Sequence, residues 1–323
     1  MHVLPHVPLV SIVTPSLNAE PFLPEAIRSV WGQDYPRIEY IVMDGGSTDG
    51  TLDLLKAHVP RLLYDSGPDK GAADAINKGF AKARGEILAW LNADDLYLPG
   101  AVARAVDALK ANPDAAGVYG EGYWIDAAGE VLGRYPTLTC DAVALERECC
   151  ICQPTCFLRR EAMEAIGMLD TELRASFDYD LWIRLAQQYP LVRIPEYLAM
   201  SRMHAENKTL KDRETVFKES IALLARHYRY VPVRWIYGYR SFQRDRRDQF
   251  FEPLRYSALT YLSTLAAGLR YNRAHPMKYV AEWLSAFRPS NLLQLRTARC
   301  GSGGKRELPA MGERKGPRPG ARD

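Results

Sequence analysis

Five short apolar runs, the first four of them followed by residues with helical spacing of apolar side chains, most limit how this chain can fold. The runs lie at Leu9–Thr14, Ile38–Met43, Arg61–Tyr64, Ile87–Leu91 and Ala116–Tyr119. Apolar runs of this length are typical of strands that are buried on both faces. Strands that alternate with helices over short connections indicate a mostly parallel sheet covered by helices on both sides. We therefore predict an α/β fold.

The fourth run ends in Asn92-Ala93-Asp94-Asp95, and Pro99 then opens a helical pattern. In open α/β sheets, ligands bind at the carboxyl ends of the strands. Adjacent carboxylates repel each other, and a divalent cation that carries phosphates offsets their charge well, because Mg²⁺ and Mn²⁺ prefer oxygen ligands. The alternative is a solvated turn in which an aspartate caps the next helix.

The overall composition excludes several protein classes. A net charge of +3 on 323 residues is too small to indicate nucleic-acid binding by the whole chain. The first eight residues hold no Lys or Arg and are broken by proline, which is not typical of a signal peptide. The longest uncharged, apolar-leaning run, Ser257–Leu269, is too short to span a bilayer. We therefore expect a cytoplasmic protein.

Four of the six cysteines cluster at positions 149, 150, 152 and 156. The cluster lacks the paired Cys-x-x-Cys or His-x-His spacing that predicts a zinc site. We expect reduced, partly buried thiols, as is usual in the cytosol.

The chain divides into three parts. Residues 8–210 carry the α/β pattern. Strand-like pieces after Gly120 continue the same sheet: a hairpin across Ala127–Gly129, a strand at Gln153–Leu158, and two short strands at Leu191–Ile194 and Tyr197–Met203. From residue 211 to residue 298 the chain is helical, basic and aromatic. Residues 299–323 are rich in Gly, Pro, Lys and Arg, so we expect a disordered tail.

Three acidic clusters end predicted strands or open predicted helices: Asp44, the pair Asp94 and Asp95, and Asp178 with Asp180. Successive parallel strands end at one edge of a sheet, so Asp44 and Asp94 should lie at the same edge. The sequence contains neither of the common glycine-rich phosphate loops and no Gly-x-Ser-x-Gly. We therefore expect a metal, together with Lys70, to neutralise bound phosphates.

Four stretches resemble the motifs of the inverting, family-two glycosyltransferases with the GT-A fold. They are Val13–Asn18, Val42–Thr51, Leu91–Asp95 and Phe177–Trp182, in the family's order. The resemblance implies a GT-A sheet, a sugar-nucleotide donor (UDP-sugar is the expected one) and Mn²⁺ or Mg²⁺. It also implies transfer with inversion to a hydroxyl of a glycan or a lipid-linked acceptor, in the synthesis of cell-surface polysaccharides.

The resemblance also implies roles for single residues. Donor-binding roles fall to Pro15, Asn18, Asp44, Asp69, Lys70, Asn92 and Asp95. Asp44 would accept a hydrogen bond from the base, although a turn residue that bonds its own backbone is the alternative. Asn92 replaces the first acid of the family's Asp-x-Asp; its carbonyl oxygen can still accept but contributes no charge. Asp94 would bind the metal, and His204 would complete the metal shell or reach the diphosphate, unless it is an ordinary packed residue.

Inversion requires one carboxylate that takes a proton from the acceptor, on the side of the sugar opposite the leaving diphosphate. Asp178 and Asp180 lie two residues apart on a predicted helix, so only one of them can face the acceptor. The family often has Glu-Asp here; Phe177 replaces the Glu, and Asp178 retains the second acid. We assign Asp178 as the base and Asp180 as a helix cap or support; the alternative is that both are caps.

Residues 226–247 contain seven arginines interleaved with aromatic residues, and an amphipathic segment follows. One interpretation is a helix on an anionic membrane surface, at the inner face of the cell membrane, where a lipid-linked acceptor is met. The other is a solvated helical subdomain that covers the core.

Two other functions remain open. A sugar-nucleotide nucleotidyltransferase would usually carry an early glycine-rich phosphate loop with Arg and Lys, and none precedes Pro15. A non-catalytic carbohydrate-binding relative is the second, and the intact acidic residues of all three clusters argue against it.

Overall fold

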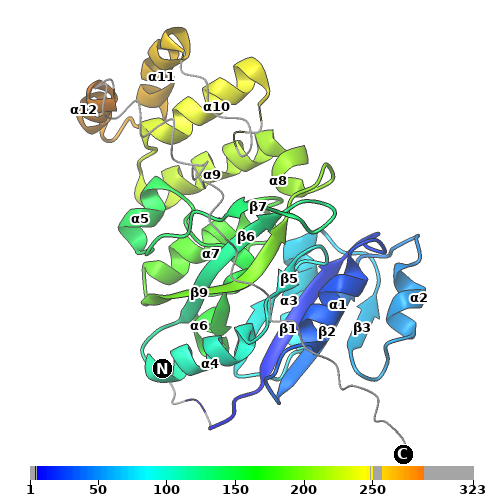
Figure 1. Cartoon of the computed structure of the whole chain (residues 1–323). Helices are drawn as coiled ribbons and strands as arrows, with labels where there is room; N and C mark the ends of the chain where they lie inside the picture. The colour runs from blue at the N-terminus through cyan, green and yellow to red at the C-terminus, as the bar shows by residue number, and fades with distance from the viewer. Residues whose placement is uncertain (1–3, 5, 248, 250–256, 287–323) are drawn as a thin grey trace, which may run out of the picture.

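The computed structural model describes residue 4, residues 6–247, residue 249 and residues 257–286. In this part of the chain, nine strands form one sheet with helices on both faces (Figure 1). The strand order is β3-β2-β1-β4-β8-β6-β9-β5, and β7 pairs with β6. The predicted α/β architecture is therefore confirmed.

The first half of the sheet is parallel. Its strands are β1 (Val10–Ser16), β2 (Ile38–Asp44), β3 (Leu63–Ser66) and β4 (Ile87–Trp90). The helices between them are α1 (Leu23–Trp31), α2 (Thr51–Lys56) and α3 (Ala72–Lys82). Ser16 lies opposite Asp44 in the register of β1 and β2, so these two strands end at the same edge.

The second half of the sheet is mixed. Its strands are β5 (Leu96–Tyr97), β6 (Gly117–Ile125), β7 (Val131–Arg134), β8 (Phe157–Arg159) and β9 (Leu191–Arg202). β8 is antiparallel to both β4 and β6, which makes β6 parallel to β4. The predicted hairpin is β6–β7, so the chain after Gly120 continues the same sheet, as predicted.

Two predicted elements differ from the structure. The strand predicted at Gln153–Leu158 begins as a 3-10 turn, η1 (Gln153–Thr155), because Pro154 has no N–H for a strand ladder. The two short strands predicted between Leu191 and Met203 are one strand, β9, whose register with β6 shifts around Pro195.

Each face of the sheet carries a hydrophobic core, one under α1, α2 and α4 and the other under α3 and α5–α7. The helices not yet given are α4 (Ala101–Ala111), α5 (Ala142–Arg147), α6 (Arg160–Ile166) and α7 (Phe177–Ala186). In the second core, Trp90 of β4 stacks on Trp182 of α7, with ring centroids 5.6 Å apart. This stack holds α7 against the strand that leads into the acidic loop.

Five helices follow β9: α8 (Lys208–Lys211), α9 (Arg213–Tyr228), α10 (Val233–Asp245), α11 (Ala258–Tyr271) and α12 (Pro276–Ala286). Leu224 of α9 and Trp235 of α10 belong to the same core as α7. Figure 1 shows α10–α12, in yellow to orange, at one end of the molecule beyond α9. The domain division at residues 210 and 298 stays a prediction, and the tail predicted at 299–323 lies outside the described residues.

The aromatic residues of segment 226–247 are mostly covered by protein: Tyr230, Trp235 and Tyr237 are buried. This segment therefore packs over the core, as the second interpretation expected. The large exposed apolar side chains of the C-terminal helices lie on α11 and α12 instead, and include Leu259, Leu262, Met277 and Leu284. Among the described residues, no helix combines the length and apolarity needed to cross a membrane.

The cysteines depart in part from expectation. Cys140 and Cys150, on either side of α5, form a disulfide with their Cα atoms 6.4 Å apart. This corrects the expectation of a reduced thiol at Cys150; the helix between the two residues brings them together, and no spacing in the sequence indicates that. Cys152 and Cys156 are free, buried thiols.

Candidate active site

A cavity of about 880 Å³ opens at the edge of the sheet where β1, β4 and β9 end. Eight of the ten predicted site residues line it: Pro15, Asn18, Asp69, Asn92, Asp94, Asp95, Asp178 and His204. Asp44 and Lys70 are not among the described residues that line it. Loops and helices far apart in the sequence thus bring Asp94 and Asp178 to one cavity, whereas the third acidic cluster that ends a strand, Asp44, does not line it.

Asp94, after β4, meets His204, after β9, at this edge. His204 Nε2 lies 3.0 Å from Asp94 Oδ2, and the Phe22 ring packs against the imidazole with centroids 4.7 Å apart. A carboxylate oxygen and an imidazole nitrogen are ligands that Mn²⁺ accepts. The described residues contain no group of three or more His, Cys, Asp or Glu able to hold a metal, so a cation here would need further oxygens from a ligand or water.

Asp95 is buried beside Asp94 and holds the acidic loop in place. Its Oδ1 accepts a hydrogen bond from the Arg202 N–H at 2.9 Å, and its Oδ2 accepts one from Asn92 Nδ2 at 3.0 Å. Asn92 Nδ2 also donates to Gln153 Oε1 at 3.1 Å. Burial raises the pKa of Asp95 well above its usual range, and the charge of Asp94 adds to this.

The Arg202 guanidinium, which we did not predict as a site residue, binds three other parts of the chain. It donates to Asp94 O at 2.9 Å, to Asp126 O at 3.2 Å, to Ala127 O at 2.9 Å and to Glu25 Oε2 at 2.5 Å. The side chain is almost completely buried. Arg202 therefore fixes the acidic loop to α1 and to the hairpin, and nothing near it in the sequence indicates these partners.

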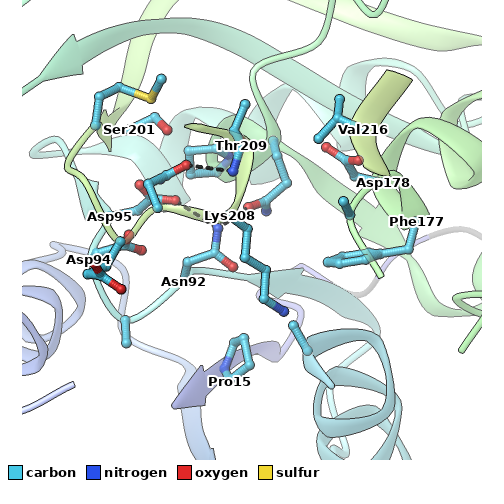
Figure 2. A pocket seen from close by; sticks show the side chains of 18 of the residues that line it. Pro15, Asn92, Asp94, Asp95, Phe177, Asp178, Ser201, Lys208, Thr209 and Val216 are labelled. Carbon is cyan, nitrogen blue, oxygen red and sulfur yellow. Dashed lines mark hydrogen bonds between the residues drawn. The ribbon is translucent and has the colours of Figure 1, made fainter. Parts of the chain in front are cut away.

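Asp178 lies in the first turn of α7 and faces the cavity, between Phe177 and Val216 (Figure 2). Its Oδ1 accepts a hydrogen bond from the Tyr179 N–H at 2.8 Å. Burial is the main cause that raises the pKa of Asp178 to about 6, and the negative charge of Glu219 acts in the same direction. A carboxylate with such a pKa is suited to accept a proton near neutral pH.

Asp180 is directed away from the cavity and is fully buried in a cluster of cations. Its carboxylate accepts hydrogen bonds from Arg184 at 2.6 Å, from Arg226 at 2.5 Å and from His227 at 2.9 Å. Burial opposes ionisation, but the bonds from His227 and the two arginines outweigh it and lower the pKa of Asp180 to about 2. The helical spacing thus separates the two acids as predicted, and Asp180 has a supporting position.

The Asp44 carboxylate braces the loop after β2. It is buried and accepts hydrogen bonds from the N–H groups of Gly46 and Ser47, from the Ser47 hydroxyl and from Ser66 Oγ. This matches the turn residue named as the alternative, and a contact between Asp44 and a nucleobase stays a prediction. Asn18 lines the cavity itself, and its Oδ1 accepts from the Thr48 N–H at 2.9 Å.

Asp69 lines the cavity, where its Oδ1 accepts from the Gly71 N–H at 2.7 Å. A Cβ at Gly45 would lie 2.6 Å from Asp69 Oδ2, so only glycine fits at position 45 without a shift. Lys70 is exposed and lies outside the cavity lining.

Lys208, on α8, extends its amine into the cavity in the direction of Pro15 (Figure 2). Desolvation by the surrounding walls lowers the pKa of Lys208, while the charge of Asp69 acts against this. The cation that we expected at Lys70 is therefore present in the cavity at Lys208. In the sequence, Lys208 is marked only by its position four residues after His204, the predicted metal ligand.

Similarity to known proteins identifies the family of this chain. Residues 11–167 match the model of Glycosyl transferase family 2. A PGL/p-HBAD biosynthesis glycosyltransferase of Mycobacterium bovis is 32% identical over 190 residues, which are 57% of this chain and 72% of the relative. The chain belongs to glycosyl transferase family 2.

Some relatives of the chain are longer than it is. Chondroitin synthase of Escherichia coli is 27% identical over 244 residues, which are 71% of this chain but 35% of the synthase. The chain therefore spans about a third of that relative's length. Family membership supports the predicted glycosyltransferase and argues against a sugar-nucleotide nucleotidyltransferase.

Two solved structures share the fold of this family 2 chain. Staphylococcus aureus TarS 1–349 in complex with UDP has a TM-score of 0.61 at 16% identity, over 90% of this chain and 87% of TarS. A mannosyltransferase from Pyrobaculum calidifontis in complex with GDP-Man and Mn²⁺ has a TM-score of 0.54 at 20% identity, over 90% and 79%. Both likenesses concern the fold, and they confirm the predicted GT-A type.

The family 2 match ends at residue 167 and therefore includes Asp44 and Asp94 but not Asp178, His204 or Lys208. These three residues join the cavity because α7, the end of β9 and α8 pack around it.

Proposed function

We propose that this family 2 enzyme transfers a sugar from a nucleoside-diphosphate donor to a hydroxyl group, with inversion at the anomeric carbon. The observation that carries the proposal is a single cavity with Asp94 and Asp178 on opposite sides (Figure 2). A diphosphate on the Asp94 side leaves the other face of the sugar open to a hydroxyl beside Asp178. Inversion requires this arrangement.

The donor that we propose is a UDP-sugar. A protein of the same fold binds UDP, and another binds GDP-Man, so this fold accommodates nucleoside diphosphates and their sugars. Pro15, Asn18 and Asp69 would line the nucleotide. Asp44 would support it by bracing the loop that Asn18 contacts through Thr48.

A divalent cation, Mn²⁺ or Mg²⁺, would be held by Asp94 and His204. The fit rests on the oxygen and nitrogen ligands that these side chains bring within 3.0 Å of each other. Two protein ligands leave positions for phosphate oxygens. When bound, the cation would stabilise the charge that develops on the leaving diphosphate.

The remaining chemistry falls to side chains of the chain. As the acceptor oxygen forms its bond to the anomeric carbon, the bond from that carbon to the diphosphate oxygen breaks, and Asp178 takes the acceptor's proton. Near-neutral pH suits this step, because the pKa of Asp178 is raised to about 6 by burial. Lys208 supplies a positive charge close to where the diphosphate would lie.

We further propose a glycan or lipid-linked acceptor, used in the synthesis of cell-surface polysaccharide. The aromatic residues Trp124, Tyr135 and Trp235 in the cavity wall could pack against a sugar ring. Contact with an anionic membrane, if it brings a lipid-linked acceptor, would use the exposed leucines of α11 and α12. The buried aromatic residues of α10 do not serve this role.

The test is the product of donor hydrolysis, in which water replaces the unidentified acceptor. The full chain is incubated with Mn²⁺ and a panel of UDP- and GDP-sugars, and proton NMR follows the first free sugar released. We expect a nucleoside diphosphate together with the anomer opposite to that of the donor. Release of the same anomer would contradict inversion, and the absence of turnover with every donor would contradict the proposed donor class.

A further inference from the structure

Glu219, on α9, binds the segment that leads into α7. Its Oε1 accepts a hydrogen bond from the Arg174 N–H at 2.8 Å. Its Oε2 accepts from the N–H groups of Ala175 at 2.9 Å and Ser176 at 2.8 Å. Hydrogen bonds from N–H groups to a carboxylate are among the stronger kinds in proteins. Because Asp178 is the second residue after Ser176, this one carboxylate anchors the backbone from which the base projects.

α9 contacts the same junction at further points. Ser176, the residue before α7, places its Oγ 3.4 Å from Val216 O and 3.4 Å from Ser220 Oγ. Ala175, Ser176, Val216 and Ser220 all line the cavity. The far end of α9 binds Asp180, one turn into α7. A change at Glu219 would therefore reach Asp178 through packed backbone.

We propose that Glu219 is a positioning residue for the base. It sets where the Asp178 carboxylate stands relative to the incoming hydroxyl, and it holds a second carboxylate close to the start of the helix that carries Asp178. This inference rests on the proposed function, in which Asp178 takes that proton. Glu219 itself acts without contact to the substrate.

The electrostatic half of the inference agrees with the environment of Asp178. Burial is the main cause of the raised pKa of Asp178, and the like charge of Glu219 raises this pKa further. Other ionisable side chains in the cavity lining are Asp69, Asp94, Asp95, Tyr135, Glu148, Cys149, Cys152, Tyr179, His204, Glu206, Lys208 and Arg213. They are the same in the enzyme and in any variant at position 219, so such variants isolate the contribution of Glu219.

The test compares the pH dependence of kcat in three variants. E219Q removes the charge and one acceptor oxygen. We expect kcat to fall about ten- to hundredfold. We also expect the acid limb of the pH profile, where kcat rises with pH, to move to lower pH. E219D keeps the charge on a shorter side chain, so kcat should fall while the acid limb stays in place. E214Q is the matched control, because Glu214 lies on the same helix and pairs with Lys218 and Arg246 at the surface.

E214Q should have the same kcat and the same pH profile as the wild type. An E219Q enzyme with an unmoved acid limb would overturn the electrostatic half of the proposal. Wild-type kcat in E219D would overturn the positioning half, and this variant keeps that half testable if E219Q does not fold.

A second measurement does not depend on turnover. Thermal unfolding at pH 8 of the wild type, D178N, E219Q and the double variant forms a cycle. We expect D178N to raise Tm less in the E219Q background, because ionised Asp178 is then no longer near a like charge. If D178N raises Tm equally in the wild type and in E219Q, this would contradict an interaction between Glu219 and Asp178. If no donor is turned over, the proposed function fails, but this cycle still decides whether Glu219 and Asp178 interact.

Discussion

Asp178 and Asp180 are the same side chain in two environments on one helix. Asp178 faces the cavity, where burial raises its pKa to about 6. Asp180 lies among His227, Arg184 and Arg226, which lower its pKa to about 2. One residue type thus supplies a proton acceptor and a permanent anion, because the helix directs the two side chains to different neighbours.

Asp178→Asn should abolish transfer and leave donor binding intact, because only the acceptance of the proton is lost. It should also stabilise the protein above pH 6. Since the pKa of Asp178 rises on folding from 3.8 to about 6, its stabilising contribution is present at low pH and is lost as pH rises through that value. We expect a gain on the order of 2 kcal/mol at pH 8 and almost none at pH 4.

The check for Asp178→Asn is chemical denaturation at the two pH values, together with kcat and the donor Kd. Unchanged turnover would assign the base to another residue. A variant less stable than the wild type at pH 8 would contradict the raised pKa of Asp178.

Lys208→Gln should weaken donor binding about tenfold, because a positive charge close to the diphosphate is removed. Lys70→Gln is the matched control, since Lys70 is exposed outside the cavity lining, and we expect its donor Kd to equal that of the wild type. Isothermal titration with UDP and Mn²⁺ gives both values. A larger loss in the Lys70 variant than in the Lys208 variant would restore the original prediction.

Site residues could be predicted where a short motif follows a strand, because the sheet itself places such residues at the ligand edge. Asp94 and Asn18 are of this kind. The choice between Lys70 and Lys208 depends on side-chain direction and on α8, which packs against the cavity from over a hundred residues away. No local sequence pattern encodes the direction of a lysine side chain or the place where α8 packs.

At the scale of elements, α7 is held from two sides. The Trp90–Trp182 stack joins it to β4, and α9 binds its start through Glu219 and its next turn through Asp180. The position of the base relative to the acidic loop is therefore set by packing on rigid elements. The existence of α7 could be predicted from its apolar spacing, whereas these partners depend on tertiary contacts.

Leu259→Gln with Leu262→Gln on α11 should reduce binding to vesicles that contain anionic lipid, because both side chains are exposed and would enter the interface. Co-sedimentation with vesicles of phosphatidylcholine and phosphatidylglycerol measures it. The control is Leu138→Gln, at an exposed leucine far from α11 in the sequence, which should bind as the wild type does. Equal binding by all three proteins, or no binding by the wild type, would contradict the membrane proposal.

For the molecule as a whole, the α/β class and the order of the first strands could be predicted, since apolar runs and helical spacing are local signals. The sheet order could not, because β8 inserts between β4 and β6, and β9 between β6 and β5. These insertions depend on which strands meet after distant segments have folded.

Chelation should stop transfer, and Mn²⁺ should restore it. Mn²⁺ with UDP should raise Tm by several degrees, because ligands that bind the folded state stabilise it. Asp94→Asn should lose most of this shift, whereas Asp53→Asn, at an exposed residue of α2, should keep it. Full activity in excess chelator, or an unchanged shift in Asp94→Asn, would contradict the metal role of Asp94.

The late insertion of β9 has a consequence for synthesis on the ribosome. β5, directly after the acidic loop, pairs with β9 through Leu96 and Met200, and Arg202 fastens Asp94 from the end of the same strand. Until residue 204 has left the exit tunnel, the nascent polypeptide therefore has neither the clamp on its acidic loop nor its imidazole. On the proposed mechanism, sugar transfer can begin only after α7 and the residues at the end of β9 have emerged.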